Sequence, residues 1–302
     1  MIRVLASFLL LAATAVHADP PDPCKQVRIT EVDLVTQPDG LVAVPAEIDD
    51  YPILLAVDTG AIHTVISSRI ADDLKLSRDM STDIYEIVGG LPVYRMAYSH
   101  SFKLGTLAAG RVGLLVASPS AFPIDTDGVF GPDGMKNYDV EIDYAHSKFA
   151  LFSQDHCPGR VVYWTHTPYA QVPMRVDKDA HVTVPILLDG KPLTALIDTG
   201  AERSFMTQSV ARDIFGIDLG ALTKSAEVSL NGAAPTTVYH HDFNSLALEG
   251  ITVRHPDIDI LPDESVGRGG PQLVVGASVL RQLHLYLAYR EQMLYATPAE
   301  AQ

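Results

Sequence analysis

The tetrapeptide Asp-Thr-Gly-Ala occurs twice in this chain, beginning at Asp58 and again at Asp198. Each copy follows a short apolar run, so each aspartate is expected where a β-strand ends. One such copy on its own is typical of an ordinary turn, because Asp hydrogen-bonds its own backbone and Gly accepts positive φ. Two carboxylates held close together could instead divide the proton transfers of one reaction step between a general base and a general acid. The chemistry therefore depends on whether the fold brings Asp58 and Asp198 together.

The sequence around the two motifs is an internal repeat. Residues 41–61, LVAVPAEIDDYPILLAVDTGA, align without a gap with residues 181–201, HVTVPILLDGKPLTALIDTGA. A second match without a gap joins residues 129–144 with residues 274–289. The chain is therefore predicted to be a duplicated domain in which the two aspartates occupy equivalent positions.

Each half is predicted to consist mostly of β-structure. Apolar runs bounded by Gly, Pro, Asp and Ser indicate strands at 41–48, 52–57, 112–117 and 182–188. Short helices are expected after each Asp-Thr-Gly-Ala motif, where a Ser or Thr suits the N-cap, and after Gly131 and Gly276. Hairpin tips are expected at 88–93 and 230–235, because Gly-Gly and Asn-Gly accept the positive φ of tight turns.

This pattern resembles the aspartic protease superfamily, which contains the two-lobed pepsin-like enzymes and the half-sized retropepsins. Besides the two Asp-Thr-Gly motifs, each half carries a hydrophobic-hydrophobic-Gly segment that ends at Gly131 or Gly276. The Asp-Thr-Gly-Ala form is similar to retropepsins, whereas two halves on one chain are pepsin-like, so a single-chain, bacterial-type form is expected. The resemblance implies an all-β, bilobal fold of two duplicated, barrel-like lobes with short helices and a peptide-binding cleft between them.

The resemblance also implies an aspartic endopeptidase in which Asp58 and Asp198 polarise a shared water. As in the familiar dyad of that superfamily, the ionised carboxylate would take the water's proton while the protonated one donates to the scissile carbonyl oxygen. No metal, cofactor or covalent intermediate is required. Thr59 and Thr199 would hydrogen-bond across the axis, and the glycines that follow would allow close approach of the backbone; these are Gly60 and Gly200.

A flap over the substrate is the least defined part of the expected site. Its residues would come from the two predicted hairpin tips, namely Val88, Gly89, Gly90, Asn231 and Gly232. Three tyrosines are candidates for the flap tyrosine of pepsin-like enzymes: Tyr85, Tyr94 and Tyr98. The Arg that retropepsins carry after the second glycine motif is missing, because Pro132-Asp133 and Ala277-Ser278 stand there. A retropepsin-like ion pair beneath the site is therefore not expected.

Other polar groups have simpler interpretations. His240-His241-Asp242 has no further ligand at metal-binding spacing in the sequence, so a solvated strand or turn is favoured over a metal site. Ser67 and Ser204 are expected to be turn or cap residues rather than nucleophiles. A second function on the same fold is a catalytically silent peptide-binding module outside the cytoplasm. Two intact aspartates argue against that alternative, because a decayed enzyme commonly loses one.

Length and composition are those of a globular protein with room for two domains. The chain has 302 residues, of which 47% are hydrophobic and 20% charged. A net charge of −15 without any cluster of Lys or Arg argues against nucleic acid as a partner. The expected partner is a peptide or protein substrate. Because both half-sites lie on one chain, a monomer is expected.

The N-terminus predicts export from the cytoplasm. Residues 1–18 carry one Arg, a short apolar stretch and a small-residue exit, typical of a secretory signal peptide cleaved before Asp19; a short membrane anchor is less favoured. The mature protein is thus expected in the periplasm or secreted, without membrane attachment. Cys24 and Cys157 would form a disulfide there, while a nucleophilic Cys157 beside His156 is the weaker alternative.

The expected organisation follows from these observations. It comprises a signal peptide at 1–18, an N-terminal lobe at 19–155, a linker at 156–176 and a C-terminal lobe at 177–302.

Overall fold

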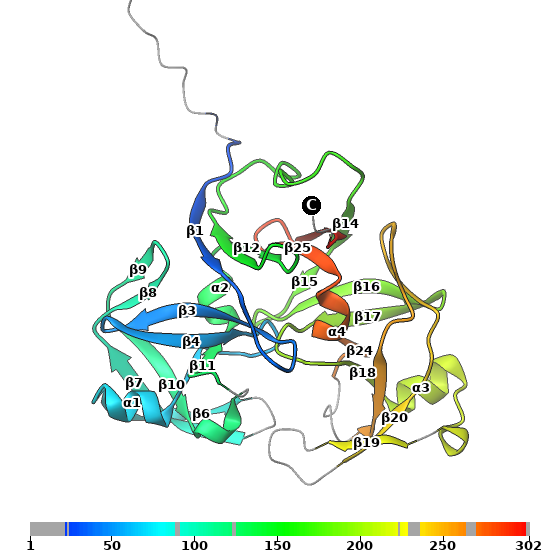
Figure 1. The fold of residues 1–302 in the computed structure, drawn as a ribbon, viewed down its shortest axis with the longest axis horizontal. Coiled ribbons are helices and arrows are strands. Elements are labelled where there is room, and N and C mark those ends of the chain that lie inside the picture. The colour runs from blue at the N-terminus through cyan, green and yellow to red at the C-terminus, as the bar shows by residue number, and fades with distance from the viewer. Residues whose placement is uncertain are drawn as a thin grey trace, which may run out of the picture.

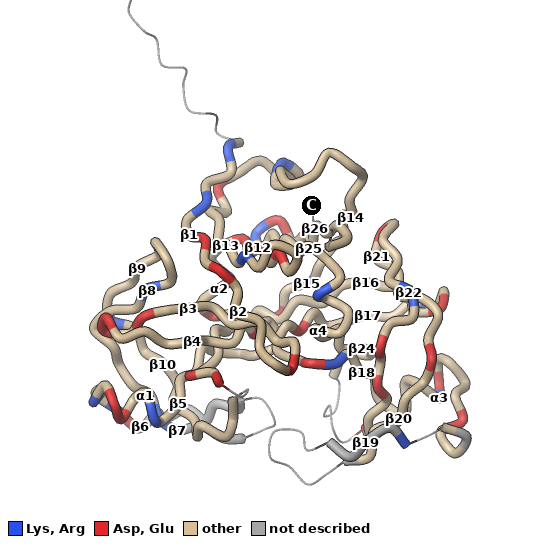
Figure 2. The backbone as a smooth tube through the Cα atoms, in the orientation of Figure 1, with Lys and Arg blue, Asp and Glu red and all other residues tan. Residues whose placement is uncertain are grey.

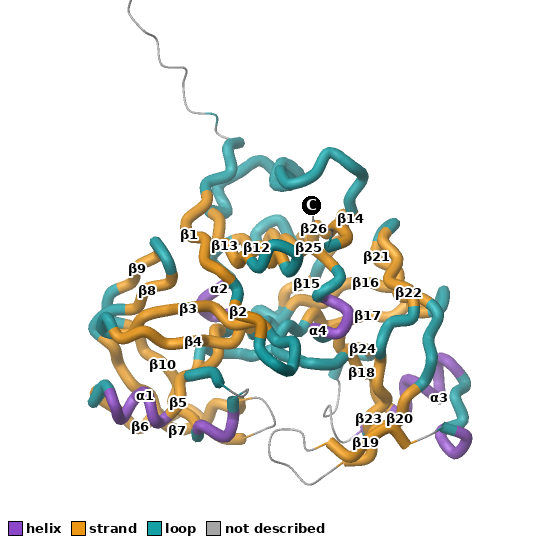
Figure 3. The backbone as a smooth tube through the Cα atoms, viewed as in Figure 1, coloured by secondary structure: helices purple, strands orange, loops and turns teal. Residues whose placement is uncertain are grey.

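The computed structural model describes residues 22, 24–87, 91–122, 125–222, 224–228, 236–263 and 270–299. Within these ranges, the side chains of 80–87, 91–94, 221, 225–228 and 236 are not described. The described chain folds into two lobes, each built on one β-sheet, with a third sheet joining them (Figure 1). Strands dominate and helices are short (Figure 3). The expected all-β, bilobal fold is therefore confirmed.

The N-terminal lobe is built on a ten-stranded sheet with the order β6-β7-β10-β5-β11-β4-β3-β8-β9 and β2 paired to β3. Its strands are β2 (Val35–Thr36), β3 (Val42–Ile48), β4 (Tyr51–Val57), β5 (Val65–Ser67), β6 (Ser77–Ile87), β7 (Leu91–Ser99), β8 (Phe102–Leu104), β9 (Leu107–Ala109), β10 (Val112–Ala117) and β11 (Gly128–Phe130).

The C-terminal lobe repeats this arrangement. Its ten-stranded sheet has the order β19-β20-β23-β18-β24-β17-β16-β21-β22, with β15 paired to β16. The strands are β15 (Arg175–Val176), β16 (Val182–Leu188), β17 (Lys191–Ile197), β18 (Ser204–Thr207), β19 (Lys224–Val228), β20 (Thr236–His240), β21 (Ser245–Leu248), β22 (Ile251–Arg254), β23 (Ile258–Leu261) and β24 (Leu273–Val275). Each N-terminal strand thus has a C-terminal counterpart at the same place in its sheet, as the internal repeat predicts.

A six-stranded sheet joins the lobes, and it was not foreseen from the sequence. Its order is β1-β13-β12-β25-β26-β14. The strands are β1 (Arg28–Asp33), β12 (Asp139–Asp143), β13 (Lys148–Phe152), β14 (Ala170–Pro173), β25 (Leu283–Ala288) and β26 (Met293–Pro298). At its centre β12 and β25 pair antiparallel, with Val140 opposite Leu287. The ends of the two repeats therefore meet in one sheet and hold the lobes together.

Four short α-helices and two 3₁₀ turns complete the described fold. They are α1 (Ser68–Asp73), η1 (Pro119–Ala121), α2 (Pro132–Met135), α3 (Gln208–Phe215), η2 (Leu219–Ala221) and α4 (Ala277–Leu280). Ser67 caps α1 by accepting the N–H of Ile70, and Thr207 caps α3 by accepting the N–H of Val210. The helices expected after both motifs and both glycine segments are confirmed. None of the helices in the described ranges is long and apolar enough to cross a bilayer.

Because side chains alternate along its strands, the joining sheet has an apolar face and a second, polar face that also carries an aromatic cluster with Phe152 and Tyr286. Val140, Ile142 and Leu285 pack into the large core shared by the lobes. The opposite face buries Glu141 and His284, whose Oε1 and Nε2 lie 2.9 Å apart. The joining sheet thus contributes to the shared core through one face and keeps charged groups on the other.

The polar face is covered by residues 153–169, which contain no helix or strand (Figure 1, green, above the joining sheet). Tyr163 donates its hydroxyl to Glu141, and the Trp164 ring stacks on His284 with centroids 4.3 Å apart. The disulfide between Cys24 and Cys157, with Cα atoms 4.6 Å apart, ties this covering segment to the N-terminal strand region. The predicted disulfide is confirmed. The lobe boundaries expected at 155 and 177 remain predictions.

Candidate active site

Each Asp-Thr-Gly-Ala motif begins where a strand leaves its sheet. β4 ends at Val57, and the N–H of Asp58 donates to the carbonyl oxygen of Phe130 over 3.1 Å. In the other lobe the N–H of Asp198 donates to the carbonyl oxygen of Val275 over 3.0 Å. Because β4 runs parallel to β11, and β17 parallel to β24, each motif is held against the segment before its glycine. The repeat therefore places both aspartates at the same point of two matching sheets.

Two threonines lock the motifs to each other. The Thr59 hydroxyl donates to the carbonyl oxygen of Ile197, and the Thr199 hydroxyl donates to that of Val57, each over 2.7 Å. Each hydroxyl oxygen in turn accepts the backbone N–H of the opposite threonine, over 3.0 and 3.1 Å. Both threonines are fully buried. The structure thus brings together the threonines that the resemblance implies.

The carboxyl group of each aspartate is oriented by its own loop. The Oδ1 atom of Asp58 accepts the N–H groups of Gly60 and Ala61 over 2.9 and 2.8 Å. The Oδ1 atom of Asp198 accepts the equivalent N–H groups of Gly200 and Ala201 over 2.9 and 3.1 Å. Equivalent bonds to Oδ1 therefore fix the two carboxyl groups in matching orientations.

Glycine is required beside each aspartate because the opposite carboxyl group is so close. A Cβ atom built on Gly60 would lie 2.3 Å from the carboxyl carbon of Asp198, and one on Gly200 would lie 2.2 Å from that of Asp58. No real Cβ tolerates such contacts. The carboxyl group of each lobe therefore occupies the space that a side chain would fill in the other.

The environment of the two aspartates raises the pKa of both carboxyl groups. Burial raises the pKa of Asp58 above its ordinary value, although the loop N–H groups and a hydrogen bond from Asp198 oppose the rise. Burial and then the negative charge of Asp58 raise the pKa of Asp198 to about 8. Two carboxylates this close cannot both be ionised at low cost, so one proton stays between them near neutral pH.

A second layer of hydrogen bonds supports each motif. In the N-terminal lobe Asp133 accepts both the N–H and the hydroxyl of Thr64, over 2.8 and 2.7 Å, and also pairs with His63. In the C-terminal lobe the Ser204 N–H donates to the Ser278 hydroxyl over 3.0 Å. These contacts stand where retropepsins carry an Arg after the glycine. Asp133 and Ser278 therefore link the glycine segments to the active-site loops without that ion pair.

The expected flap residues Val88, Gly89 and Gly90 lie outside the described residues, as do Asn231 and Gly232. The strands beside them are present, because β6 and β7 form one hairpin and β19 and β20 the other. Among the candidate tyrosines, Tyr98 lies near the base of its hairpin with the Arg111 guanidinium 4.4 Å from its ring centre. The side chains of Tyr85 and Tyr94 are outside the described part.

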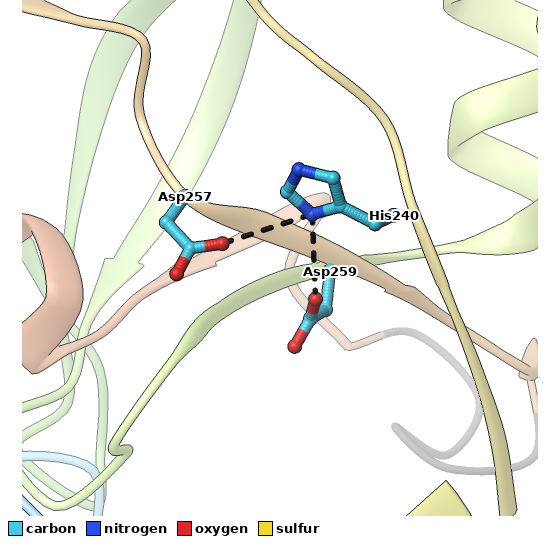
Figure 4. A group of neighbouring side chains, drawn as sticks. All are labelled: His240, Asp257 and Asp259. Carbon is cyan, nitrogen blue, oxygen red and sulfur yellow. Dashed lines mark ion pairs between the residues drawn. The ribbon is translucent and has the colours of Figure 1, made fainter. Parts of the chain in front are cut away.

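One group of described side chains has the arrangement of metal ligands. His240, Asp257 and Asp259 place ligand atoms within 4.8 Å of one another. Figure 4 shows both carboxylates on the same side of the His240 ring. The guanidinium of Arg203 already contacts both carboxylates, with Nη2 2.6 Å from Asp257 and 3.0 Å from Asp259. A cation here would have to sit beside that positive charge. The sequence pattern missed this cluster because Asp257 and Asp259 reach His240 through strand pairing.

Two further polar groups near the dyad also escaped the sequence analysis. The Tyr144 hydroxyl is buried with no hydrogen-bond partner among the described residues, and burial together with the negative charge of Asp198 raises its pKa. The Nε2 atom of His181 is likewise buried and unpartnered in the described part of the chain, and its charge lowers the pKa of Asp58. The internal repeat offers a signal only for His181, which stands where the first half has Leu41. Elsewhere on the described backbone, basic and acidic positions are interspersed (Figure 2).

Comparison with known proteins places the chain in a family. Solved structures similar to it include conglutin gamma, a basic 7S globulin from lupine seeds, and the basic 7S globulin from soybean. Both have TM-scores of 0.55 and 12% identity over 90% of this chain, covering 95% and 96% of their own chains respectively, which is a likeness of fold. The search of curated proteins found no match. The profile of the aspartyl protease family matches residues 44–133 and 184–279, which include both Asp-Thr-Gly-Ala motifs, and the chain belongs to that family.

Proposed function

We propose that the protein is an aspartic endopeptidase that cleaves peptide bonds with a water activated by Asp58 and Asp198. The observation that carries this proposal is the mutual enclosure of the two carboxyl groups, each filling the space beside the other's glycine. Such an enclosure raises the pKa of both groups, so that one proton is shared between them near neutral pH. Two aspartates in ordinary solvent-exposed turns would not be expected to enclose each other's carboxyl groups in this way.

The chemistry assigns different roles to the two carboxyl groups. Burial and mutual repulsion leave one proton between the two carboxyl groups, and the protonated one donates it to the carbonyl oxygen of the scissile bond. The ionised one takes a proton from the water as the water oxygen attacks the carbonyl carbon. The tetrahedral intermediate then collapses as the nitrogen leaves with a proton. Neither aspartate forms a covalent bond to the substrate.

The substrate class follows from the location of the dyad between two sheets. An extended peptide with apolar side chains near the cleaved bond suits an all-β site of this kind. The disulfide between Cys24 and Cys157 is typical of oxidising compartments, which supports action outside the cytoplasm after removal of residues 1–18. Both carboxyl groups come from one chain, so we expect a monomer to be active, with specific activity that does not change on dilution.

A catalytically silent peptide-binding module is the alternative function. It is favoured by the fold similarity to proteins named as 7S globulins rather than as enzymes. Against it stand the presence of both aspartates and the close approach of their carboxyl groups to each other's glycine, neither of which peptide binding requires.

Peptide cleavage by the mature protein tests the proposal directly. A library of extended peptides should yield products whose formation stops with a statine-type inhibitor and in both Asp58→Asn and Asp198→Asn. Binding of the library peptides without cleavage by the wild-type protein, from acid to neutral pH, would instead establish the silent module.

A further inference from the structure

Each active-site loop ends in a basic residue that packs against the glycine segment of its own lobe. In the internal repeat His63 is equivalent to Arg203, because each stands five residues after its aspartate. A Cβ atom built on Gly131 would lie 2.5 Å from the carbonyl oxygen of His63. In the other lobe a Cβ atom on Gly276 would lie 2.6 Å from that of Arg203. The backbone of the two residues is therefore held at matching places.

The side chains of these two residues have different partners. In the N-terminal lobe, Nδ1 of His63 lies 3.4 Å from Oδ2 of Asp133, which belongs to α2 after the glycine segment. The residue equivalent to Asp133 in the C-terminal lobe is Ser278, which carries no charge. An ion pair like that of the N-terminal lobe is therefore not possible between Arg203 and α4.

Arg203 instead pairs with two carboxylates at the start of a neighbouring strand. Its Nε and Nη2 contact both oxygens of Asp259, with Nη2 3.0 Å from Oδ1, which makes a bidentate pair. Nη2 also lies 2.6 Å from Oδ1 of Asp257. Asp259 stands opposite Phe205, because β23 runs parallel to β18. Since Arg203 immediately precedes β18, these contacts fasten the end of the loop to β23.

The N-terminal lobe has an apolar residue where Asp259 stands. By the internal repeat Val65 is equivalent to Phe205. Val65 pairs with Leu115 of β10, so Leu115 occupies the place of Asp259. Asp259 is only 5% exposed, and burying a carboxylate carries a desolvation cost that burying a leucine does not. The ion pair is therefore a costly departure from the arrangement of the other lobe, and stability alone does not account for it.

We propose that Arg203, held by Asp259 and Asp257, is a positioning residue for the catalytic carboxyl group of Asp198. The guanidinium is charged at every pH at which the protein is folded, so the contact does not depend on the titration of a neighbour. In the N-terminal lobe the pair of His63 with Asp133 holds the equivalent point of the loop. This inference rests on the proposed function, to which it adds a residue that sets the geometry of the dyad.

The loop itself transmits the effect. It carries the N–H groups of Gly200 and Ala201, which hold Oδ1 of Asp198 over 2.9 and 3.1 Å. Arg203 lies two residues beyond Ala201, so fixing its side chain on β23 limits movement of the loop backbone. Without that anchor, the two N–H groups would no longer be held in the directions that orient the carboxyl group.

Exchanging the ion pair for apolar residues separates positioning from stability. Arg203→Met alone leaves the buried Asp259 without its partner and should lower both the urea unfolding midpoint and kcat. Arg203→Met with Asp259→Leu, the residue of the other lobe, removes both charges. It should recover the unfolding midpoint, because apolar residues commonly replace a buried ion pair without loss of stability. Its kcat should stay about 10- to 100-fold below that of the wild type, with a smaller change in KM, because the loop has lost its anchor.

Two control variants define the contact further. Arg290→Met removes an exposed ion pair with Asp155, 2.9 Å long, and should leave kcat unchanged. Arg203→Lys keeps the charge but not the bidentate geometry, so its kcat should lie between those of the wild type and Arg203→Met. If kcat recovers together with the unfolding midpoint when Asp259→Leu is added, Arg203 only neutralises Asp259 and the inference is wrong.

Amide hydrogen exchange distinguishes this inference from the proposed function, because it needs no peptidase activity. In the variant with Arg203→Met and Asp259→Leu, the amides of Gly200 and Ala201 should lose protection although the unfolding midpoint is recovered. The same amides should keep their protection in Arg290→Met. If the wild-type protein cleaves no peptide, the proposed function fails, yet the exchange rates still decide whether Arg203 holds the loop. Unchanged protection of Gly200 and Ala201 would overturn the inference.

Discussion

Thr59 and Thr199 form reciprocal hydrogen bonds across the axis between the lobes. The hydroxyl of each threonine donates to the carbonyl oxygen of the residue just before the other's motif. Each hydroxyl also accepts the other threonine's N–H. Four hydrogen bonds thus close a ring between residues 140 apart in the chain. The ring is fully buried, so any broken bond would leave a polar backbone group without water.

Removing one hydroxyl should therefore be costly. We expect Thr199→Val to destabilise the protein by roughly 1–3 kcal/mol, because it leaves the carbonyl of Val57 and the N–H of Thr59 unpaired. Thr199→Ser keeps the hydroxyl and should recover most of that stability. Urea unfolding monitored by circular dichroism measures both variants. Equal stability of the Val and Ser variants would show that the ring does not hold the lobes together.

Either aspartate alone should be unable to cleave peptides. Asp58→Asn and Asp198→Asn should each lower kcat to background, since one carboxylate cannot act as base and acid in the same step. The peptide assay measures turnover, and circular dichroism checks that the fold is kept. Near-normal turnover in either variant would contradict the two-carboxylate mechanism.

The raised pKa of Asp198 also predicts a dependence of stability on pH. Its pKa is about 8 in the fold and close to 4 in the unfolded chain, so the fold binds a proton more tightly between these values. The contribution of Asp198 to the free energy of unfolding is therefore complete below pH 4, and it is lost as the pH rises to 8. An asparagine at position 198 does not titrate, so the Asp198→Asn protein should not show the loss of stability that this group causes in the wild-type protein as the pH rises.

Urea titrations of the wild-type and Asp198→Asn proteins at pH 5 and pH 8 measure this effect. The difference in unfolding free energy between the two proteins should grow from pH 5 to pH 8. Asp263→Asn is a suitable control, because the pKa of that exposed carboxyl is lowered by a hydrogen bond from the Ser209 backbone and should not produce the same trend. A constant difference between the two pH values would rule out a raised pKa.

The sequence predicted local features well because they depend on neighbours in the chain. The expected strands at 41–48, 52–57, 112–117 and 182–188 match β3, β4, β10 and β16, since alternation and turn residues are local signals. The repeat placed both aspartates correctly because equivalent sequences fold equivalently. These two kinds of signal were enough for the fold class and for the dyad's geometry.

Contacts between distant segments were not predictable in the same way. The joining sheet pairs Val140 with Leu287, and the sequence of neither strand specifies which strand it will pair with. Its buried polar face did leave a trace, because DVEID at 139–143 alternates acidic and apolar residues. Such features depend on tertiary contacts that one sequence does not specify.

The disulfide should contribute to stability through the covering segment. We expect Cys24→Ser with Cys157→Ser to lose roughly 2–4 kcal/mol, because the bond closes a loop across 133 residues of separation. Urea unfolding of the oxidised protein, the reduced protein and the double variant measures the loss. Mass spectrometry of unreduced peptides provides the control that the bond is present. Identical unfolding midpoints for the oxidised protein and the double variant would contradict the prediction.

The alanine that ends each motif should raise the pH at which the dyad works. Pepsin-like enzymes commonly carry Ser or Thr there, where a hydroxyl can donate to the carboxylate, whereas Ala61 and Ala201 offer only their backbone N–H groups. A hydrogen bond to the ionised form lowers a carboxyl pKa, so Ala61→Ser with Ala201→Ser should lower both macroscopic pKa values of the pair.

The wild-type profile should accordingly lie in mildly acid to neutral conditions, with an alkaline limb near pH 8 where Asp198 loses its proton. Burial is the largest cause of the raised pKa of both aspartates, so the two serines should shift the profile toward acid without removing the rise. Measuring kcat/KM against pH for the two proteins tests this. If both limbs of the pH profile stay in place in the double variant, or move to higher pH, then burial and mutual repulsion alone determine the pH range in which the dyad works.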